Sequence, residues 1–201
     1  VYKRQVLSTD KDAATGRTLV QIGDGDHTVS AIFNKRRSRG FFPDVAAYRL
    51  DRLLKLDMVP VTVRREVDGK DGSVQFYPPN VMDESQRAEE GRGYSATCPI
   101  RDQVMAMYVF DVLVFNEGRI LQHMLYDTSN WRLMLIDHRK AFGTRKGRPR
   151  HLVNAPVEMT GGWRAELEAL DNDVLNQQLA DVLDKRRLAA LAARRDELLE
   201  Q

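Results

Sequence analysis

Asp137 stands at the end of an apolar stretch, Leu133–Ile136, and is followed directly by His138. A carboxylate there favours the oxygen coordination that Mg²⁺ and Mn²⁺ take, although a strand-terminal turn residue is the simpler alternative. His123 is a second candidate metal ligand, but hard cations prefer oxygen, and a lone histidine is more often a packed, hydrogen-bonded side chain. Residue types alone name Asp137 and His123 as side chains able to hold a cation, and they assign no site.

The first part of the chain is predicted to form strands and one helix, and these elements must position the candidate residues. β-Branched residues alternate with polar ones in two pairs of segments, and apolar residues recur at helical spacing between the pairs. We expect this helix to pack on the first hairpin. The predicted elements are a hairpin of Arg17–Ile22 and His27–Phe33, a helix from Asp44, and a second hairpin of Val59–Val67 and Ser73–Tyr77.

The second part is mostly helical, beyond a break at Pro78–Asn80 and a polar, acidic segment, Asp83–Gly93. We expect an incomplete strand-rich lobe at 6–81, a mobile linker or loop at 82–96 and a helical lobe at 97–201, which is an α+β, bilobal arrangement. A cleft between two lobes is a usual place for a ligand. The predicted elements are a helix at Ile100–Phe115, short strands around Met124–Tyr126 and Arg132–Ile136, and helices at Trp163–Leu170, Val174–Leu183 and Arg186–Leu199.

Composition excludes several classes of protein. With 42% hydrophobic and 30% charged residues, the 201-residue chain suits one globular, bilobal domain. The net charge of +2 is too small to indicate nucleic acid as a partner, and no apolar run approaches the roughly 18 residues of a membrane span. The single cysteine, Cys98, excludes an internal disulfide and fits a reducing, cytoplasmic compartment without establishing it.

Four segments of the chain resemble segments of a bacterial kinase-like family, and they occur in the same order as in that family. The family is related to the phosphatidylinositol 3-/4-kinase-like, HipA-like and secretory-pathway casein kinase-like groups. The resemblance covers nearly all of residues 17–199, and Ala193–Leu199 matches the family's closing helix. The segments are the strand of the ATP-contacting lysine at Ala31–Lys35, the helix of its acidic partner at Asp44–Pro60, the catalytic loop at Phe110–Arg119 and the metal-binding segment at Trp131–Phe142.

The resemblance implies ATP with Mg²⁺ or Mn²⁺ as the cofactor, because phosphoryl transfer depends on positioning and on neutralising phosphate charge. It implies that Lys35, Asp44 and Asp137 contact the nucleotide and that Asp137 and His123 hold the metal. The nucleotide and an unidentified protein or small-molecule substrate are the expected partners.

The nucleotide-binding positions depart from the family pattern. Asn34 stands where the lysine is expected, with Lys35 one residue along. Strand alternation points Lys35 away from the cleft unless a bulge re-aims it, and Lys35 also begins a solvated basic run. Asp44 replaces the usual glutamate and equally suits a helix N-cap.

The catalytic loop departs further. It reads Asn116-Glu117-Gly118-Arg119, so a glycine replaces the catalytic aspartate, and His123 replaces a later asparagine. Glu117 could substitute only if the loop were re-routed. Arg119 is interpreted as the partner of a buried acid rather than as a group acting directly on the substrate. We place Asn116, Glu117 and Arg119 in the candidate catalytic set.

These departures favour a kinase-fold phosphotransferase homologue with impaired catalysis, a pseudokinase that binds nucleotide or serves as a scaffold. One alternative is an active, divergent ATP-dependent kinase that uses Lys35, Glu117 and Asp137. The other is a nucleotide-free module that docks a partner through the basic loop Arg139–Arg150.

The N-terminus, Val1–Gln5, resembles a translated sequencing-library adapter, with a native but truncated start as the alternative. We therefore expect a fragment that lacks its first strands and a glycine-rich phosphate loop.

Overall fold

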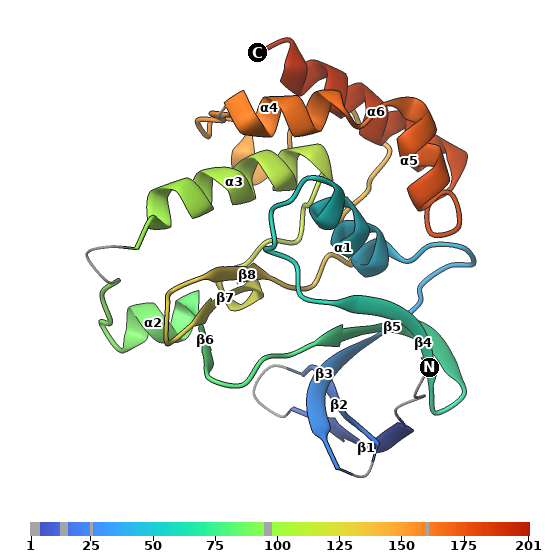
Figure 1. Ribbon diagram of the computed structural model, residues 1–201, viewed down its shortest axis with the longest axis vertical. Coiled ribbons are helices and arrows are strands. Elements are labelled where there is room, and N and C mark those ends of the chain that lie inside the picture. Colours follow the sequence, from blue (N-terminus) through green and yellow to red (C-terminus); the bar gives the residue numbers. More distant parts are fainter. Residues whose placement is uncertain (1–4, 13–15, 25, 95–97, 160) are drawn as a thin grey trace.

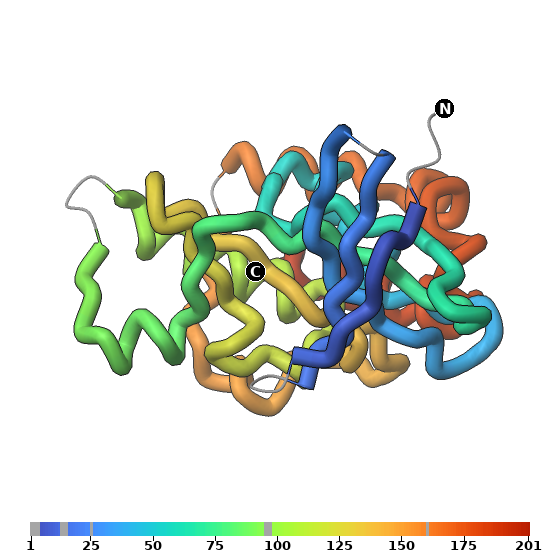
Figure 2. The backbone as a smooth tube through the Cα atoms, turned by 90° about the horizontal axis from the view of Figure 1, so that it is seen from below, coloured from blue at the N-terminus to red at the C-terminus, as the bar shows by residue number. Residues whose placement is uncertain are grey.

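Five antiparallel strands form the first lobe in a computed structural model that describes residues 5–12, 16–24, 26–94, 98–159 and 161–201. Their order in the sheet is β1-β2-β3-β5-β4 (Figure 1). Figure 2 shows β1, β2 and β3 side by side across one end of the molecule. The strands are β1 (Gln5–Lys11), β2 (Thr18–Gly23), β3 (Thr28–Lys35), β4 (Thr62–Val67) and β5 (Lys70–Phe76).

The strand β1 lies outside the two predicted hairpins. It pairs with β2 from Gln5 opposite Gly23 to Lys11 opposite Thr18, with a register shift between Val6 and Ser8. Six of its seven residues are exposed, so the segment has no alternation of apolar and polar residues for sequence analysis to detect. Apart from Gln5, the segment that resembles an adapter lies outside the described residues.

Tight turns and close packing set the geometry of the sheet. Asp68 and Gly69, both at positive φ (49° and 71°), join β4 to β5 as a two-residue hairpin turn. The strand β5 then passes so close to β3 that a Cβ on Gly72 would lie 2.4 Å from the carbonyl oxygen of Asn34. Only glycine permits that approach, which holds the end of β3 in place.

Helix α1 (Pro43–Leu53) connects the two lobes. It contacts the sheet through β4 and β5 rather than mainly through the 17–35 hairpin, as sequence analysis expected. Its apolar residues, among them Val45 and Leu50, belong to the large core that also contains the C-terminal helices. The amphipathic pattern alone did not show which of two apolar surfaces would receive the helix.

A three-stranded sheet and a long helix begin the second lobe. Strands β6 (Val81–Asp83), β7 (Met124–Asp127) and β8 (Leu133–Leu135) are antiparallel in that order. The segment expected as a linker, 82–96, contains part of β6 and the short helix α2 (Glu84–Glu89), which Asp83 caps through the backbone N–H of Gln86.

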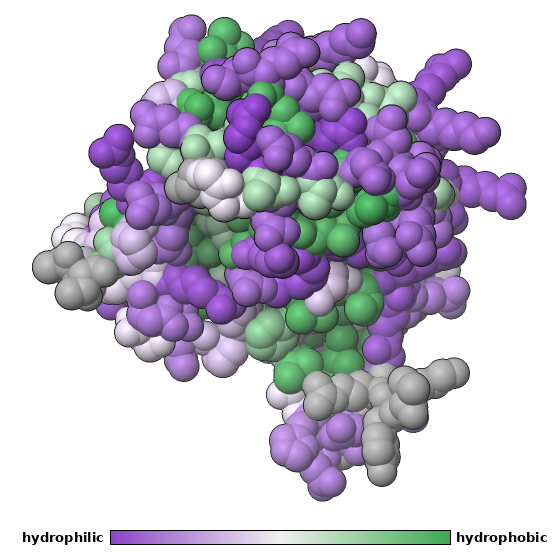
Figure 3. All heavy atoms as spheres, turned by 45° about the horizontal axis from the view of Figure 1, so that its top comes forward, coloured by the Kyte–Doolittle hydropathy of each residue, from purple (hydrophilic) through white to green (hydrophobic). Residues whose placement is uncertain are grey.

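Helices complete the second lobe and its core (Figure 1). Asp171 and Asp184 accept hydrogen bonds from backbone N–H groups at the starts of α5 and α6. The face that carries the C-terminal helices is largely hydrophilic (Figure 3). In the described part of the chain, no helix has the length and hydropathy to cross a bilayer. The helices are α3 (Ile100–Leu113), α4 (Gly161–Glu168), α5 (Asn172–Leu179) and α6 (Lys185–Leu199), with short 3-10 helices η1 (Leu121–His123) and η2 (Arg150–Leu152).

Candidate functional site

Strand alternation in β3 directs the side chains of Ile32 and Asn34, which lie on the same face, to the cleft between the lobes. Ile32 packs against residues of β7 and β8, while Asn34 reaches α1. Ala31 and Phe33, on the opposite face, belong to a separate core within the five-stranded sheet. The cleft is therefore bounded by one face of β3 and by the strands and loops of the second lobe.

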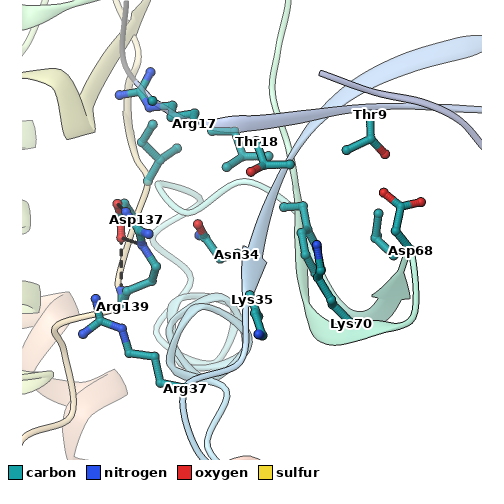
Figure 4. Close-up of a pocket in the computed structure, with 15 residues that line it drawn as sticks. Thr9, Arg17, Thr18, Asn34, Lys35, Arg37, Asp68, Lys70, Asp137 and Arg139 are labelled. Atoms are coloured by element: carbon teal, nitrogen blue, oxygen red, sulfur yellow. Dashed lines mark hydrogen bonds and ion pairs between the residues drawn. The ribbon is translucent and has the colours of Figure 1, made fainter. Parts of the chain in front are cut away.

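A cavity of about 360 Å³ lies where the end of β3 meets the segment after β8. Figure 4 shows that its labelled charged side chains come from several separate segments of the chain. Thr9 of β1, Gly16, and Thr18 of β2 also line it. The charged lining residues are Arg17, Lys35, Arg37, Asp68, Lys70, Asp137 and Arg139.

Lys35 follows the predicted alternation but still reaches this cavity. It is exposed and faces opposite to Asn34, and the strand ends at this residue, so Lys35 lies at the rim. Among the described residues, neither Lys35 nor Lys70 has an ion-pair partner. Both ammonium groups are therefore available to an anion without breaking an existing contact.

Asp44 is buried beneath the cleft and accepts three hydrogen bonds. Asn34 Nδ2 and Ser73 Oγ each lie 3.1 Å from Asp44 Oδ2, and the backbone N–H of His138 lies 2.7 Å from Oδ1. The helix N-cap position is instead Phe42, which has no side-chain cap, so the N-cap interpretation of Asp44 is wrong. The neutral amide of Asn34 thus lies beside Asp44, at the position where a lysine was expected.

Burial and the nearby charge of Asp137 raise the pKa of Asp44 to about 6. Because the folded state then binds the proton more tightly than the unfolded chain, stability falls as pH rises from about 4 to about 6 and stays lower above. We expect Asp44→Asn to raise the free energy of unfolding at pH 7.5 by about 2–3 kcal/mol. The gain should vanish near pH 4.

Urea unfolding of both proteins across pH 4–8 measures this difference. The exposed Asp102→Asn on α3 is the control, for which we expect no pH-dependent gain. A loss of stability in Asp44→Asn at pH 7.5 would instead mean that the charged carboxylate is required by its three donors.

Asp137 lies in the cleft beside Arg139 and His123, and burial lowers the pKa of His123 below its usual value. Arg139 donates from Nε to Asp137 Oδ1 at 2.7 Å and from Nη2 to Oδ2, and His123 Nε2 is 3.3 Å from Oδ2. Burial alone would raise the pKa of Asp137, but the hydrogen bond from Arg139 and the charge of His123 outweigh it and lower the pKa to about 2. The backbone of Asp137 has φ 57°, an uncommon conformation for a residue other than glycine.

Arg119 ties the loop of residues 116–119 to the segment that carries Asp137. Its Nε and Nη2 donate to the two carboxylate oxygens of buried Asp111, each at 2.8 Å. Its Nη1 donates to the carbonyl oxygens of His123 and Ile136 at 3.1 Å. The buried acid expected as the partner of Arg119 is therefore Asp111, on α3.

Asn116 completes this network. Its Nδ2 donates to Asp111 Oδ1 at 3.0 Å, and its Oδ1 accepts from the backbone N–H of Gly118. Although burial opposes it, the charge of Arg119 lowers the pKa of Asp111. Asn116 and Arg119 hold the shape of the loop through these contacts.

Buried Gly118 provides no side chain at the position of the expected catalytic aspartate. A Cβ there would lie 3.0 Å from Lys140 Cβ, so the space beside this glycine is already occupied. The neighbouring Glu117 is exposed, and its Oε1 lies 3.7 Å from Arg145 Nη1. In this arrangement Glu117 faces the basic loop.

His138, which directly follows Asp137, is fully buried. Its Nε2 lies 3.2 Å from Arg119 Nη2, so Nε2 accepts, and its Nδ1 has no hydrogen-bond partner in the described part of the chain. Burial and the charge of Arg119 lower the pKa of His138 to about 3. The neutral imidazole packs edge-on against Phe110.

The donor set does not fit a metal ion held by the protein alone. Among the described residues, no three His, Cys, Asp or Glu side chains lie close enough to share one ion. The carboxylate of Asp137 is already occupied by Arg139, and that of Asp44 accepts three hydrogen bonds. Mg²⁺ typically uses one or two carboxylates plus substrate phosphates, so a metal would need both phosphates and release of Arg139.

Sequence analysis identified many of the residues that meet here and missed others. The structure brings Asp137, His123 and Arg119 together, and Lys35 lies across the cavity from Asp137. Glu117 lies in a separate surface pocket with the basic loop. The missed residues are Arg17, Arg37, Ser73, Asp111, His138 and Lys70, while Arg139 was expected only as part of the basic loop; the one acid in the otherwise apolar stretch 104–115 was a usable signal for Asp111.

A strand-rich lobe and a helical lobe with this cleft between them define a kinase-like α+β fold. The Helicobacter pylori proinflammatory kinase CtkA superposes with a TM-score of 0.54 at 10% identity over 96% of this chain and 92% of that chain. The complete CtTel1 dimer gives a TM-score of 0.51 at 10% identity over 98% of this chain and 11% of that chain. No family model matches the sequence, and no curated protein matches it.

Proposed function

We propose that this kinase-fold chain binds a phosphate-bearing ligand in its interlobe cleft and transfers phosphate poorly or not at all. In the kinase-like groups that the sequence resembles, ATP is the expected ligand. The single observation that carries the proposal is the cavity beside Asp137, where cationic side chains outnumber carboxylates. Charged hydrogen bonds from such groups are the strongest that a protein makes to phosphate.

Two substitutions and one ion pair support weak transfer. Asn34 presents no charge where a lysine is expected, Gly118 presents no side chain, and Asp137 is held by Arg139. Phosphoryl transfer depends on groups that position the acceptor and neutralise developing charge. Each of these losses removes one such group, so the chain retains a binding cleft with few of the groups that transfer requires.

Mg²⁺ or Mn²⁺ would accompany the phosphates only through Asp137, after Arg139 turns to another partner. Arg139 is well placed to make that exchange, because 43% of its side-chain surface is exposed and it lines the cavity. In the proposed complex, cationic side chains supply most of the charge that neutralises the phosphates.

Isothermal titration of ATP into wild type and into a Lys35→Ala, Lys70→Ala variant tests the proposal. Removing two charge-assisted contacts is expected to weaken binding by roughly 10–100-fold, since each is worth about 1.5 kcal/mol or less at an exposed rim. Chelating the metal with EDTA should weaken binding less than the double substitution does.

Lys146→Ala is the matched control, because Lys146 is exposed on the basic loop and does not line the cavity. Its affinity for ATP should equal that of wild type. Equal affinity in all three proteins, or no binding to wild type, would contradict the proposal.

A second candidate function is partner docking through the basic loop. A surface pocket of about 470 Å³ beside Gly118 is lined by Lys140, Arg145, Arg150 and His151 together with Glu117 and Arg119. No acidic residue occurs from His138 to Val157. An acidic protein segment suits this pocket, and binding of such a segment that survives the Lys35→Ala, Lys70→Ala change would favour this candidate.

A further inference from the structure

The two sheets are joined by an apolar cluster that fills the inner part of the cleft. Ile32 comes from β3, Leu125 and Met134 from β7 and β8, and Ile136 from the segment that follows β8. They are 0–4% exposed, and Leu19, Tyr77 and Val81 pack around them. We call these four buried residues the interlobe apolar cluster.

Arg17 reinforces the closure of the two lobes. From its position just before β2, its Nη2 donates to the carbonyl oxygen of Gln122 in η1 at 2.5 Å, and it also interacts with Tyr77. This contact joins the first lobe to the second beside the cluster. The inner cleft is therefore held shut by apolar packing and by a hydrogen bond across the lobes.

A nucleoside base needs an open, mostly apolar slot with faces on which to stack. The interlobe apolar cluster occupies such apolar surface with its own side chains. Admitting a base there would separate Ile32 from Leu125 and expose both to water, which opposes entry. The polar cavity beside the cluster remains open, with five cationic and two acidic side chains in its lining.

We propose that the cleft selects polyphosphate anions through their phosphate groups and gains no affinity from a nucleoside base. This inference rests on the proposed function, because it names the ligand class of the same cleft. ATP then binds through its triphosphate with the base outside the inner cleft. Inorganic tripolyphosphate binds equally well.

Titration calorimetry with three ligands tests the inference: tripolyphosphate, ATP and adenosine, with sodium sulfate at matched ionic strength as the control for screening. We expect tripolyphosphate and ATP to bind within about tenfold of each other, and adenosine to show no binding at millimolar concentration. Adenosine binding, or ATP binding far more tightly than tripolyphosphate, would overturn the inference and leave the proposed function standing. If neither phosphate ligand binds, both fall.

Ile32→Ala gives the complementary gain-of-function test, because it removes three carbons from the centre of the cluster. The ratio of ATP affinity to tripolyphosphate affinity should rise by at least about tenfold as the base gains a place to stack. If the alanine variant does not unfold in a single transition, Ile32→Val replaces it. The expected rise in the affinity ratio is then smaller. An unchanged ratio in a folded variant would show that Ile32 does not exclude the base.

Discussion

Arg119→Ala is expected to lower the free energy of unfolding by about 3–5 kcal/mol, the usual cost of breaking a buried ion pair. The side chains of Arg119 and Asp111 are 4% and 1% exposed, and Arg119 donates to both carboxylate oxygens. Its removal leaves Asp111 charged and buried, with Asn116 as its one remaining side-chain donor among the described residues. The carbonyl groups of His123 and Ile136 also lose their shared partner.

Urea unfolding measures this loss, and Arg49→Ala is the control. The Arg49–Asp181 pair has similar geometry but is 36% and 64% exposed, so its loss should cost less than about 1 kcal/mol. A double-mutant cycle with Asp111→Ala isolates the pairwise energy. Equal small losses in Arg119→Ala and Arg49→Ala would show that the buried network is not the main tie between α3 and the cleft.

Gly118→Asp combined with Asn34→Lys is expected to raise transfer of the γ-phosphate of ATP, to water or to the protein itself, by at least about 10²-fold over wild type. The aspartate restores a group that can orient an acceptor hydroxyl, and the lysine places a cation beside Asp44. Lys140 must shift by a few tenths of an ångström, and because the nearest atom is its Cβ, the backbone at Lys140 must move with it.

Gly118→Ala with Asn34→Lys is the matched control for that result. It imposes the same crowding against Lys140 without a carboxylate, so we expect no gain in rate. Robust turnover by the wild type would refute the pseudokinase hypothesis and favour the alternative in which Lys35, Glu117 and Asp137 act in a divergent active site. A wild type and both variants without detectable turnover would show that further groups are missing.

Local sequence determined most of the elements that build the cleft. Alternation of β-branched and polar residues located β2, β3 and β5, helical spacing located α1, and a strongly apolar stretch located α3. It did not reveal β1 or α2, since β1 is exposed along nearly its whole length and α2 buries no residue. A pattern of burial cannot be detected in an element that buries almost nothing.

For the candidate site, the order of segments along the chain was enough to predict that Asp137, His123 and the loop of Arg119 lie close together. Only the tertiary structure decided what each group faces. Arg139 pairs with Asp137, Asn34 lies against Asp44, and Ile32 closes the inner cleft. These contacts depend on how the two lobes pack against each other. Residue spacing and composition describe single segments, so they do not predict that packing.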